Sequence, residues 1–148
     1  MRARDLAAPF PTVGLDTPAI EAARLLAGQD LPGLIVVDRQ GRPMTILPGT
    51  QVLRMAIPRY CQDDPALARV IDEAAADLFL RELGDRTVAE CLPREYRELP
   101  VVDPDATVLE IAALMARARS PLVAVVERGT GLLGAVTLDA LLDRLVAA

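Results

Sequence analysis

The sequence predicts an α/β (α+β) fold built from two copies of one β-α-β-β-α unit, with a helical insert between them. Three observations support this prediction. The chain repeats itself at a spacing of 89 residues, each copy combines β-branched runs with helical periodicity, and 148 residues suffice for one ordinary domain or two small ones. The predicted boundaries are residues 1–56 for the first repeat, 57–86 for the insert and 87–148 for the second repeat.

The internal repeat is visible when residues 11–59 are placed against residues 100–148 without a gap. Twelve of the 49 pairs are identical, and most of the other pairs exchange one apolar residue for another. The two ends of the chain are therefore copies of one structural unit. The identical pairs are Pro11/Pro100, Val13/Val102, Asp16/Asp105, Glu21/Glu110, Ala23/Ala112, Leu25/Leu114, Ala27/Ala116, Pro32/Pro121, Val36/Val125, Val37/Val126, Arg39/Arg128 and Leu53/Leu142.

Each copy contains two strand-like runs after a short extended segment at residues 12–15 or 99–102. Residues 34–37 and 122–126 are continuous runs rich in valine, leucine and isoleucine, which is typical of strands covered on both faces. A turn with glycine follows each run. The second strands are expected at residues 44–47 and 132–136.

Each copy also contains two predicted helices. The first helix is expected to take its N-cap from Asp16 or Thr17, before Pro18, in the first copy, and from Asp105 or Thr107 in the second. Its apolar positions recur at helical spacing. They are Ile20, Ala23, Leu26 and Ala27 in the first copy and Val108, Ile111, Ala112 and Met115 in the second. The second helices are expected over residues 49–56 and 138–146.

The insert between the copies has its own helical signal. Asp63-Asp64-Pro65 supplies an N-cap followed by proline at the first helical position, and Gly84 ends the pattern. We expect a helix of about twenty residues, packed on the body or on a second subunit, with its charged residues forming a solvated face. Its apolar positions are Leu67, Val70, Ile71, Ala74 and Leu78.

Composition excludes several classes of function. The net charge is −5 and no basic stripe is present, so we expect no nucleic-acid partner. No run approaches the ~18 apolar residues of a membrane span, and no signal peptide is recognisable, so a cytoplasmic protein without a membrane partner is expected. Cys61 and Cys91 have no metal-ligand or redox spacing, so both are expected as reduced, buried thiols.

Catalysis is not expected. The chain has no histidine, which removes the commonest general base and the commonest transition-metal ligand, so no metal site is expected. The sequence contains no GxxxxGK[ST], GxGxxG or HExxH motif. A non-catalytic protein that requires no cofactor is therefore predicted.

The segment from Leu31 to Asp38, then Gly41, then Gly134-Ala135-Val136-Thr137, resembles the repeat of cystathionine-β-synthase (CBS) domains. That repeat has the approximate form ISGLPVVD, then G, then GIVTxxDLL, and the resemblance covers both ends of the chain. It implies that the two repeats pair through their sheets with pseudo-twofold symmetry, as a Bateman module. It also implies that two modules associate as a homodimer.

The resemblance implies clefts for an adenosyl ligand: AMP, ADP, ATP or S-adenosylmethionine. Thr137 stands at the threonine position that holds phosphate, while Asp139 lies one place before the family's ribose-binding aspartate, where this chain has Ala140. In the first copy Pro48 and Gln51 replace the same two residues. The positions that resemble base-contacting residues of the opposing copy are Pro11, Leu31, Pro32 and Gly33, and Arg119 is the candidate cation for a phosphate at the other cleft.

Each candidate also has a purely structural interpretation. Thr137 can serve only as a helix N-cap, Asp139 as a first-turn helix acid, Leu31 as core and Arg119 as a solvated charge. Two functions therefore stay open. The chain is a regulatory module that senses an adenosyl ligand and acts on a separate enzyme or transporter, or it is a ligand-independent scaffold for homodimerisation or partner docking.

Overall fold

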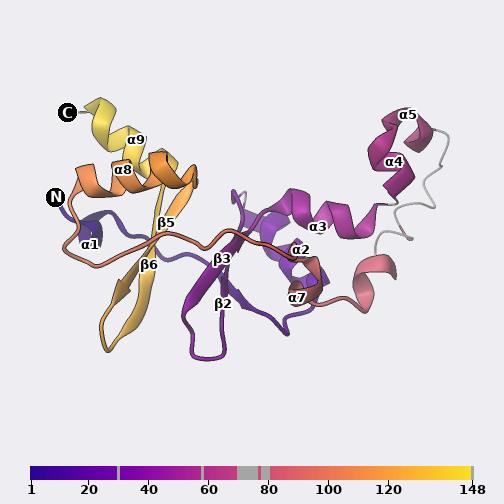
Figure 1. Cartoon of the computed structure of the whole chain (residues 1–148), viewed down its shortest axis with the longest axis horizontal. Helices are drawn as coiled ribbons and strands as arrows, with labels where there is room; N and C mark the ends of the chain where they lie inside the picture. Colours follow the sequence, from indigo (N-terminus) through magenta and orange to yellow (C-terminus); the bar gives the residue numbers. More distant parts are fainter. Residues whose placement is uncertain (30, 58, 70–76, 78–80, 148) are drawn as a thin grey trace. The chain divides into compact units, whose positions relative to one another are not determined.

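The computed structural model describes the chain except for residues 30, 58, 70–76, 78–80 and 148 (Figure 1). It contains two three-stranded sheets with strand orders β1-β2-β3 and β4-β5-β6. The predicted mixed α+β architecture is thus confirmed. The chain divides into two compact units, one comprising Met1–Thr12, Ile35–Ile46 and Arg97–Ala148 and the other Val13–Leu34 and Leu47–Tyr96.

The predicted β-α-β-β-α order is present in both repeats. The first repeat comprises β1 (Thr12–Gly14), α2 (Ala19–Gln29), β2 (Leu34–Val37), β3 (Pro43–Leu47) and α3 (Gly49–Ala56). The second comprises β4 (Val101–Val102), α8 (Val108–Ala118), β5 (Leu122–Glu127), β6 (Gly131–Thr137) and α9 (Leu138–Ala147). Further helices are α1 (Ala3–Leu6), α4 (Arg59–Asp63), α5 (Pro65–Ala68) and α7 (Val88–Cys91).

The second sheet combines a parallel and an antiparallel pair. Strand β4 runs parallel to β5, and β5 runs antiparallel to β6. The register shifts between Val125, which pairs with Gly134, and Val126, which pairs with Leu132. Leu133 is therefore the extra residue of a β-bulge, and a bulge of this kind bends the strand that carries it.

Strand β5 is buried on both faces, as its continuous apolar run predicts. Leu122 and Ala124 belong to one buried cluster with Ile35 of β2 and Ala135 of β6. The alternate residues of β5 face the other way. They are Val123 and Val125, which pack with Ile111 and Met115 of α8, Leu141 of α9 and Val136. Figure 1 shows α8 and α9 on one side of the β5–β6 hairpin.

The N-terminal segment packs against the second repeat. The Ala3 N–H donates to the carbonyl oxygen of Ala106 at 2.8 Å, and the Arg4 N–H donates to that of Pro104 at 3.0 Å. Ala3 is fully buried in the cluster that α8 and α9 form with the sheet. The first ten residues thus complete the core of the repeat at the far end of the sequence.

The segment before the second repeat makes the equivalent contacts with the first repeat. The Val88 N–H donates to the Thr17 carbonyl at 2.9 Å, and the Ala89 N–H donates to the Leu15 carbonyl at 3.0 Å. Thr17 and Leu15 lie 89 residues before the two acceptors that bind the N-terminal segment. Each repeat is therefore completed by the segment that precedes the other repeat.

The first helix of each repeat, α2 and α8, begins with a different capping arrangement. Thr107 is the N-cap of α8, since its hydroxyl accepts a hydrogen bond from the Glu110 N–H at 3.1 Å, which confirms one predicted cap. The prediction for the first copy is wrong, because the Thr17 hydroxyl accepts from the Gly14 N–H instead. Pro18 occupies the position equivalent to Thr107 and has no hydroxyl. The Ala19 N–H donates to the Arg86 carbonyl at 2.9 Å, so the α7 segment satisfies the start of α2.

The insert begins as predicted. The Asp64 side chain accepts a hydrogen bond from the Ala66 N–H, and Pro65 follows at the first position of α5. The predicted helix of about twenty residues runs through residues 70–76 and 78–80, which lie outside the described part of the chain. Cys61 and Cys91 are buried and free, as the sequence predicts. In the part of the chain that the structure describes, no helix is long and apolar enough to cross a membrane.

Candidate functional site

Thr137 closes β6 and begins α9. Its hydroxyl oxygen accepts a hydrogen bond from the Ala140 N–H at 3.2 Å, which is an N-cap interaction. The Leu138 N–H is also satisfied, since it donates to the Pro121 carbonyl at 2.8 Å. The hydroxyl hydrogen of Thr137 has no acceptor among the hydrogen bonds of the described residues. Thr137 therefore caps the helix and can still donate one hydrogen bond to a ligand.

The equivalent helix start in the first repeat has lost this arrangement. Pro48 is the N-cap of α3 and makes no side-chain hydrogen bond to the helix. The Gln51 N–H donates to the Pro48 carbonyl at 3.0 Å. Asp139, the candidate acid of the second repeat, is exposed in the first turn of α9, where a carboxylate complements the positive end of the helix.

Arg119 ends α8 in an unusual conformation. It is the C-cap, with φ of 51° and ψ of 40°, and its N–H donates to the Met115 carbonyl. This is the left-handed region, which residues with a Cβ adopt rarely. The residue is exposed and lines a groove that Pro121 and Leu138 also line.

The other candidates lie in two compact units. Pro11 is half-buried in the same unit as Thr137, and its carbonyl accepts from the Ile35 N–H at 3.4 Å. Leu31, Pro32 and Gly33 belong to the other unit. Gly33 is buried before β2, Pro32 is exposed, and Leu31 is half-buried in the wall of a groove.

An apolar groove runs between the two helices of each repeat. In the first repeat its volume is about 500 Å³, and in the second about 540 Å³. The first groove is lined by Ile20, Ala23, Arg24, Leu26, Ala27, Leu31, Gly49, Val52, Leu53 and Leu83. The second groove is lined by Ala112, Met115, Ala116, Arg119, Ser120, Pro121, Leu138, Leu141, Leu142 and Leu145.

The two grooves are the same surface, duplicated. Seven pairs of lining residues are related by the spacing of 89: Ala23/Ala112, Leu26/Met115, Ala27/Ala116, Leu31/Ser120, Gly49/Leu138, Val52/Leu141 and Leu53/Leu142. The helical periodicity that predicts a buried face thus marks the grooves. In α2 the fully buried residues are Ala19 and Ala22, one position before Ile20 and Ala23. The sequence signal for this surface is the helical spacing of these apolar residues, which by itself does not distinguish a core face from a groove.

These features define a class of protein: a duplicated β-α-β-β-α unit in which each copy has a three-stranded sheet and an apolar groove between its two helices. The family model for the CBS domain matches residues 3–49 and 93–147. The chain therefore belongs to the CBS domain family and carries two of its repeats. No curated protein matches the chain.

Solved structures agree with this assignment. A CBS domain-containing protein of unknown function from Kribbella flavida is 53% identical, covers 99% of both chains and superposes with a TM-score of 0.91. The CBS domain of a membrane protein from Sphaerobacter thermophilus is 24% identical, covers 97% of this chain and 86% of that one, and has a TM-score of 0.73.

A third structure contains a nucleotide. CBSX2, known from Arabidopsis thaliana, was solved in complex with AMP, and that structure is 17% identical to this chain. It covers 99% of this chain and 96% of its own, with a TM-score of 0.66. At this identity the likeness concerns the fold alone.

Proposed function

We propose that the chain is a non-catalytic CBS pair that acts by association, and that a second copy of the chain covers its helical grooves. The observation that carries this proposal is the duplicated groove. Leu53 and Leu142 occupy matched positions in the two grooves and are 49% and 46% exposed. Contiguous apolar surface of this kind is uncommon on monomers and typical of interaction sites.

The duplication favours a second copy as the occupant. One chain has two equivalent grooves. A second copy related by a twofold axis would supply two more equivalent surfaces to cover them. The described lining residues include one charged side chain per groove, Arg24 and Arg119, and both are exposed. The acidic residues that give the chain its net charge therefore do not oppose each other across this surface.

Sedimentation equilibrium tests the association. We expect a mass near twice 15.9 kDa at micromolar concentration. The double variant Leu53→Asp/Leu142→Asp should shift the mass to that of one chain, because each aspartate places an unpaired charge in an apolar interface. Leu133→Asp, at an exposed leucine of the β6 bulge, is the matched control and should leave the mass unchanged. A monomeric wild-type chain contradicts the proposal.

A second candidate function is adenosyl-ligand sensing at the second repeat. The helix start at Thr137 supports it, since the threonine hydroxyl can donate to a phosphate oxygen beside the positive end of the ten-residue helix α9. The AMP complex of CBSX2 also supports it. Such a module would pass the signal to a separate enzyme or transporter.

Thermal melts with AMP, ADP, ATP and S-adenosylmethionine separate the two functions. A ligand present at ~100 times its dissociation constant adds about 2.7 kcal/mol and should raise the melting temperature by several degrees. Thr137→Val should abolish that increase, whereas Thr130→Val, at an exposed threonine of the β5–β6 turn, should not. No increase with any of the four compounds would leave association as the function.

A further inference from the structure

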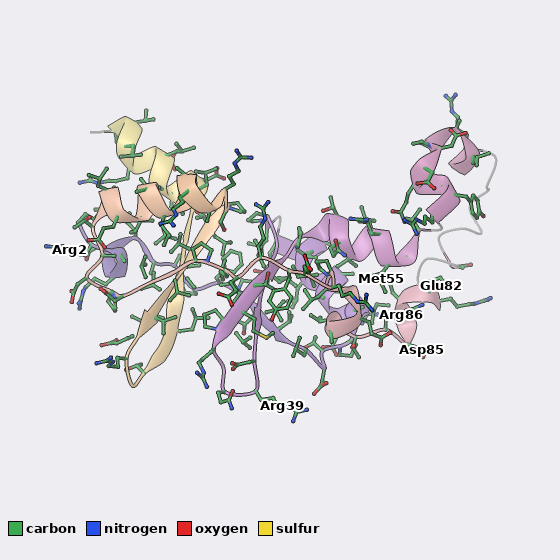
Figure 2. The ribbon with its side chains drawn as sticks, viewed as in Figure 1. Arg2, Arg39, Met55, Glu82, Asp85 and Arg86 are labelled. Atoms are coloured by element: carbon green, nitrogen blue, oxygen red, sulfur yellow. The ribbon has the colours of Figure 1, made fainter. Side chains whose placement is uncertain are left out.

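A third groove lies at the corner between α3 and α4. It has a volume of about 380 Å³ and is contained within one compact unit. Its lining residues are Gln51, Arg54, Met55, Ile57, Arg59, Gln62 and Pro93. Figure 2 marks Met55 near the end of α3.

This groove is distinct from the apolar groove of the same repeat. Helix α3 presents Gly49, Val52 and Leu53 to the apolar groove. It presents Gln51, Arg54 and Met55, which are spaced three and four residues apart, to the corner groove. Eleven of the twelve residues from 51 to 62 belong to α3 or α4 or line the groove, and these residues lie between the two matches to the family model.

The corner groove is cationic in an acidic chain. Two of its lining residues are arginines, and none of those that the structure describes is acidic. Arg54 and Arg59 are exposed, and neither belongs to the three ion pairs found among the described residues. Among the described residues, therefore, no carboxylate forms an ion pair with either guanidinium.

The Gln62 side chain links the two helices that line the groove. Its side-chain amide donates to the carbonyl oxygen of Arg54 at 3.1 Å and to that of Ile57 at 2.7 Å. These two bonds tie α4 to the last turn of α3. They also satisfy carbonyl groups at the negative end of α3, so the Arg54 guanidinium is not needed as their donor.

We propose that the corner groove binds a small oxyanion with at least two negative charges, carried by phosphate or by carboxylate groups. Two guanidinium groups offer paired N–H donors that match the oxygens of either group. Gln51 adds an amide to the lining, and Met55 and Ile57 add apolar side chains to it. The volume lies within the range of small-ligand sites.

Isothermal titration calorimetry on the full chain tests this site with pyrophosphate, citrate and acetate as probes. Saturable binding of pyrophosphate identifies a phosphate-bearing ligand, and saturable binding of citrate identifies a carboxylate-bearing one. Acetate, with a single charge, should not saturate. The double variant Arg54→Gln/Arg59→Gln should weaken the binding by at least about tenfold, and each single variant by less.

Arg39→Gln is the matched control. Arg39 is an exposed arginine outside the ion pairs of the described residues, and Figure 2 shows it at the tip of the β2–β3 hairpin. Like each single variant, it removes one positive charge from the chain, and it should leave the binding unchanged. Absence of saturable binding with both pyrophosphate and citrate overturns the proposal. If Arg39→Gln weakens the binding as much as either single variant does, the proposal is also overturned, because that result indicates a response to net charge.

Discussion

A Cβ atom on Gly134 would lie 2.5 Å from the carbonyl oxygen of Ala8. The two segments are joined there by a pair of hydrogen bonds, since the Ala8 N–H donates to the Ala135 carbonyl and the Ala135 N–H donates to the Ala8 carbonyl, both at 3.0 Å. Gly134 is therefore the position at which the N-terminal segment can approach β6. The sequence assigns this glycine to the CBS repeat motif, and the structure supplies its steric reason.

Gly134→Ala should reduce the free energy of unfolding by roughly 1–3 kcal/mol, because the Ala8 backbone must move away and lengthen two hydrogen bonds. Urea unfolding measures the change. Gly28→Ala is the control, since no atom lies within 4 Å of a Cβ at this position in α2. That variant should increase stability by about 0.5–1 kcal/mol. A Gly134→Ala protein as stable as wild type would contradict the close approach.

The N-terminal segment also contributes a core residue. Ala3 is fully buried against the second repeat, whereas Ala8 of the same segment is exposed. Ala3→Asp should therefore lower the free energy of unfolding by at least about 3 kcal/mol, since it buries an unpaired charge. Ala8→Asp, which places the same charge in solvent, should change it by less than about 0.5 kcal/mol. Equal effects in urea unfolding would mean that the segment is not docked.

The sequence does not predict that the segment preceding each repeat packs against the other repeat. Residues 2–5 and 87–90 begin the two segments, but they share no identical residue when Ala3 is placed against Val88. Their function in the fold depends on hydrogen bonds to residues about 70 to 100 positions away, which periodicity does not detect. Boundaries drawn from the repeat alone therefore miss which repeat each segment completes.

The elements of the repeats were predictable because each carries its own local signal. The runs at β2 and β5 and the helix positions of α3 and α9 agree with the structure to within one or two residues. Burial was less predictable. The stripe Ile20/Ala23/Leu26 has the spacing of a core face, yet it lines an open groove, because spacing does not specify what covers a helix.

For the candidate site, the sequence predicts which residue types are present but not the hydrogen bonds that they make. Thr137 was identified from a motif, and the structure adds that its hydroxyl caps α9. Thr137→Val should cost about 1 kcal/mol of unfolding free energy, because the Ala140 N–H loses its partner. Thr137→Ser keeps the hydroxyl and should stay within about 0.5 kcal/mol of wild type. Equal stability of the two variants in urea unfolding would show that the cap contributes nothing.

The last prediction concerns Cys91, which is buried in α7 beside the first repeat. Burial raises the pKa of the Cys91 thiol, and the negative charge of Glu90 raises it further. A thiol whose pKa is raised by folding contributes stability that is fully present below its unfolded pKa of about 8.5. That stability is lost as the pH rises through the folded pKa, because the unfolded chain releases the proton first.

The free energy of unfolding should therefore fall between pH 7.5 and pH 10, and this fall should be smaller in Cys91→Ala. Urea titrations at several pH values measure both quantities. Cys91→Ala should also lose roughly 1 kcal/mol at pH 7.5, because it leaves a small cavity. Cys61→Ala likewise removes a buried thiol, so it separates the packing loss from the pH dependence. A pH slope in Cys91→Ala as steep as that of the wild type would assign the alkaline loss to other groups.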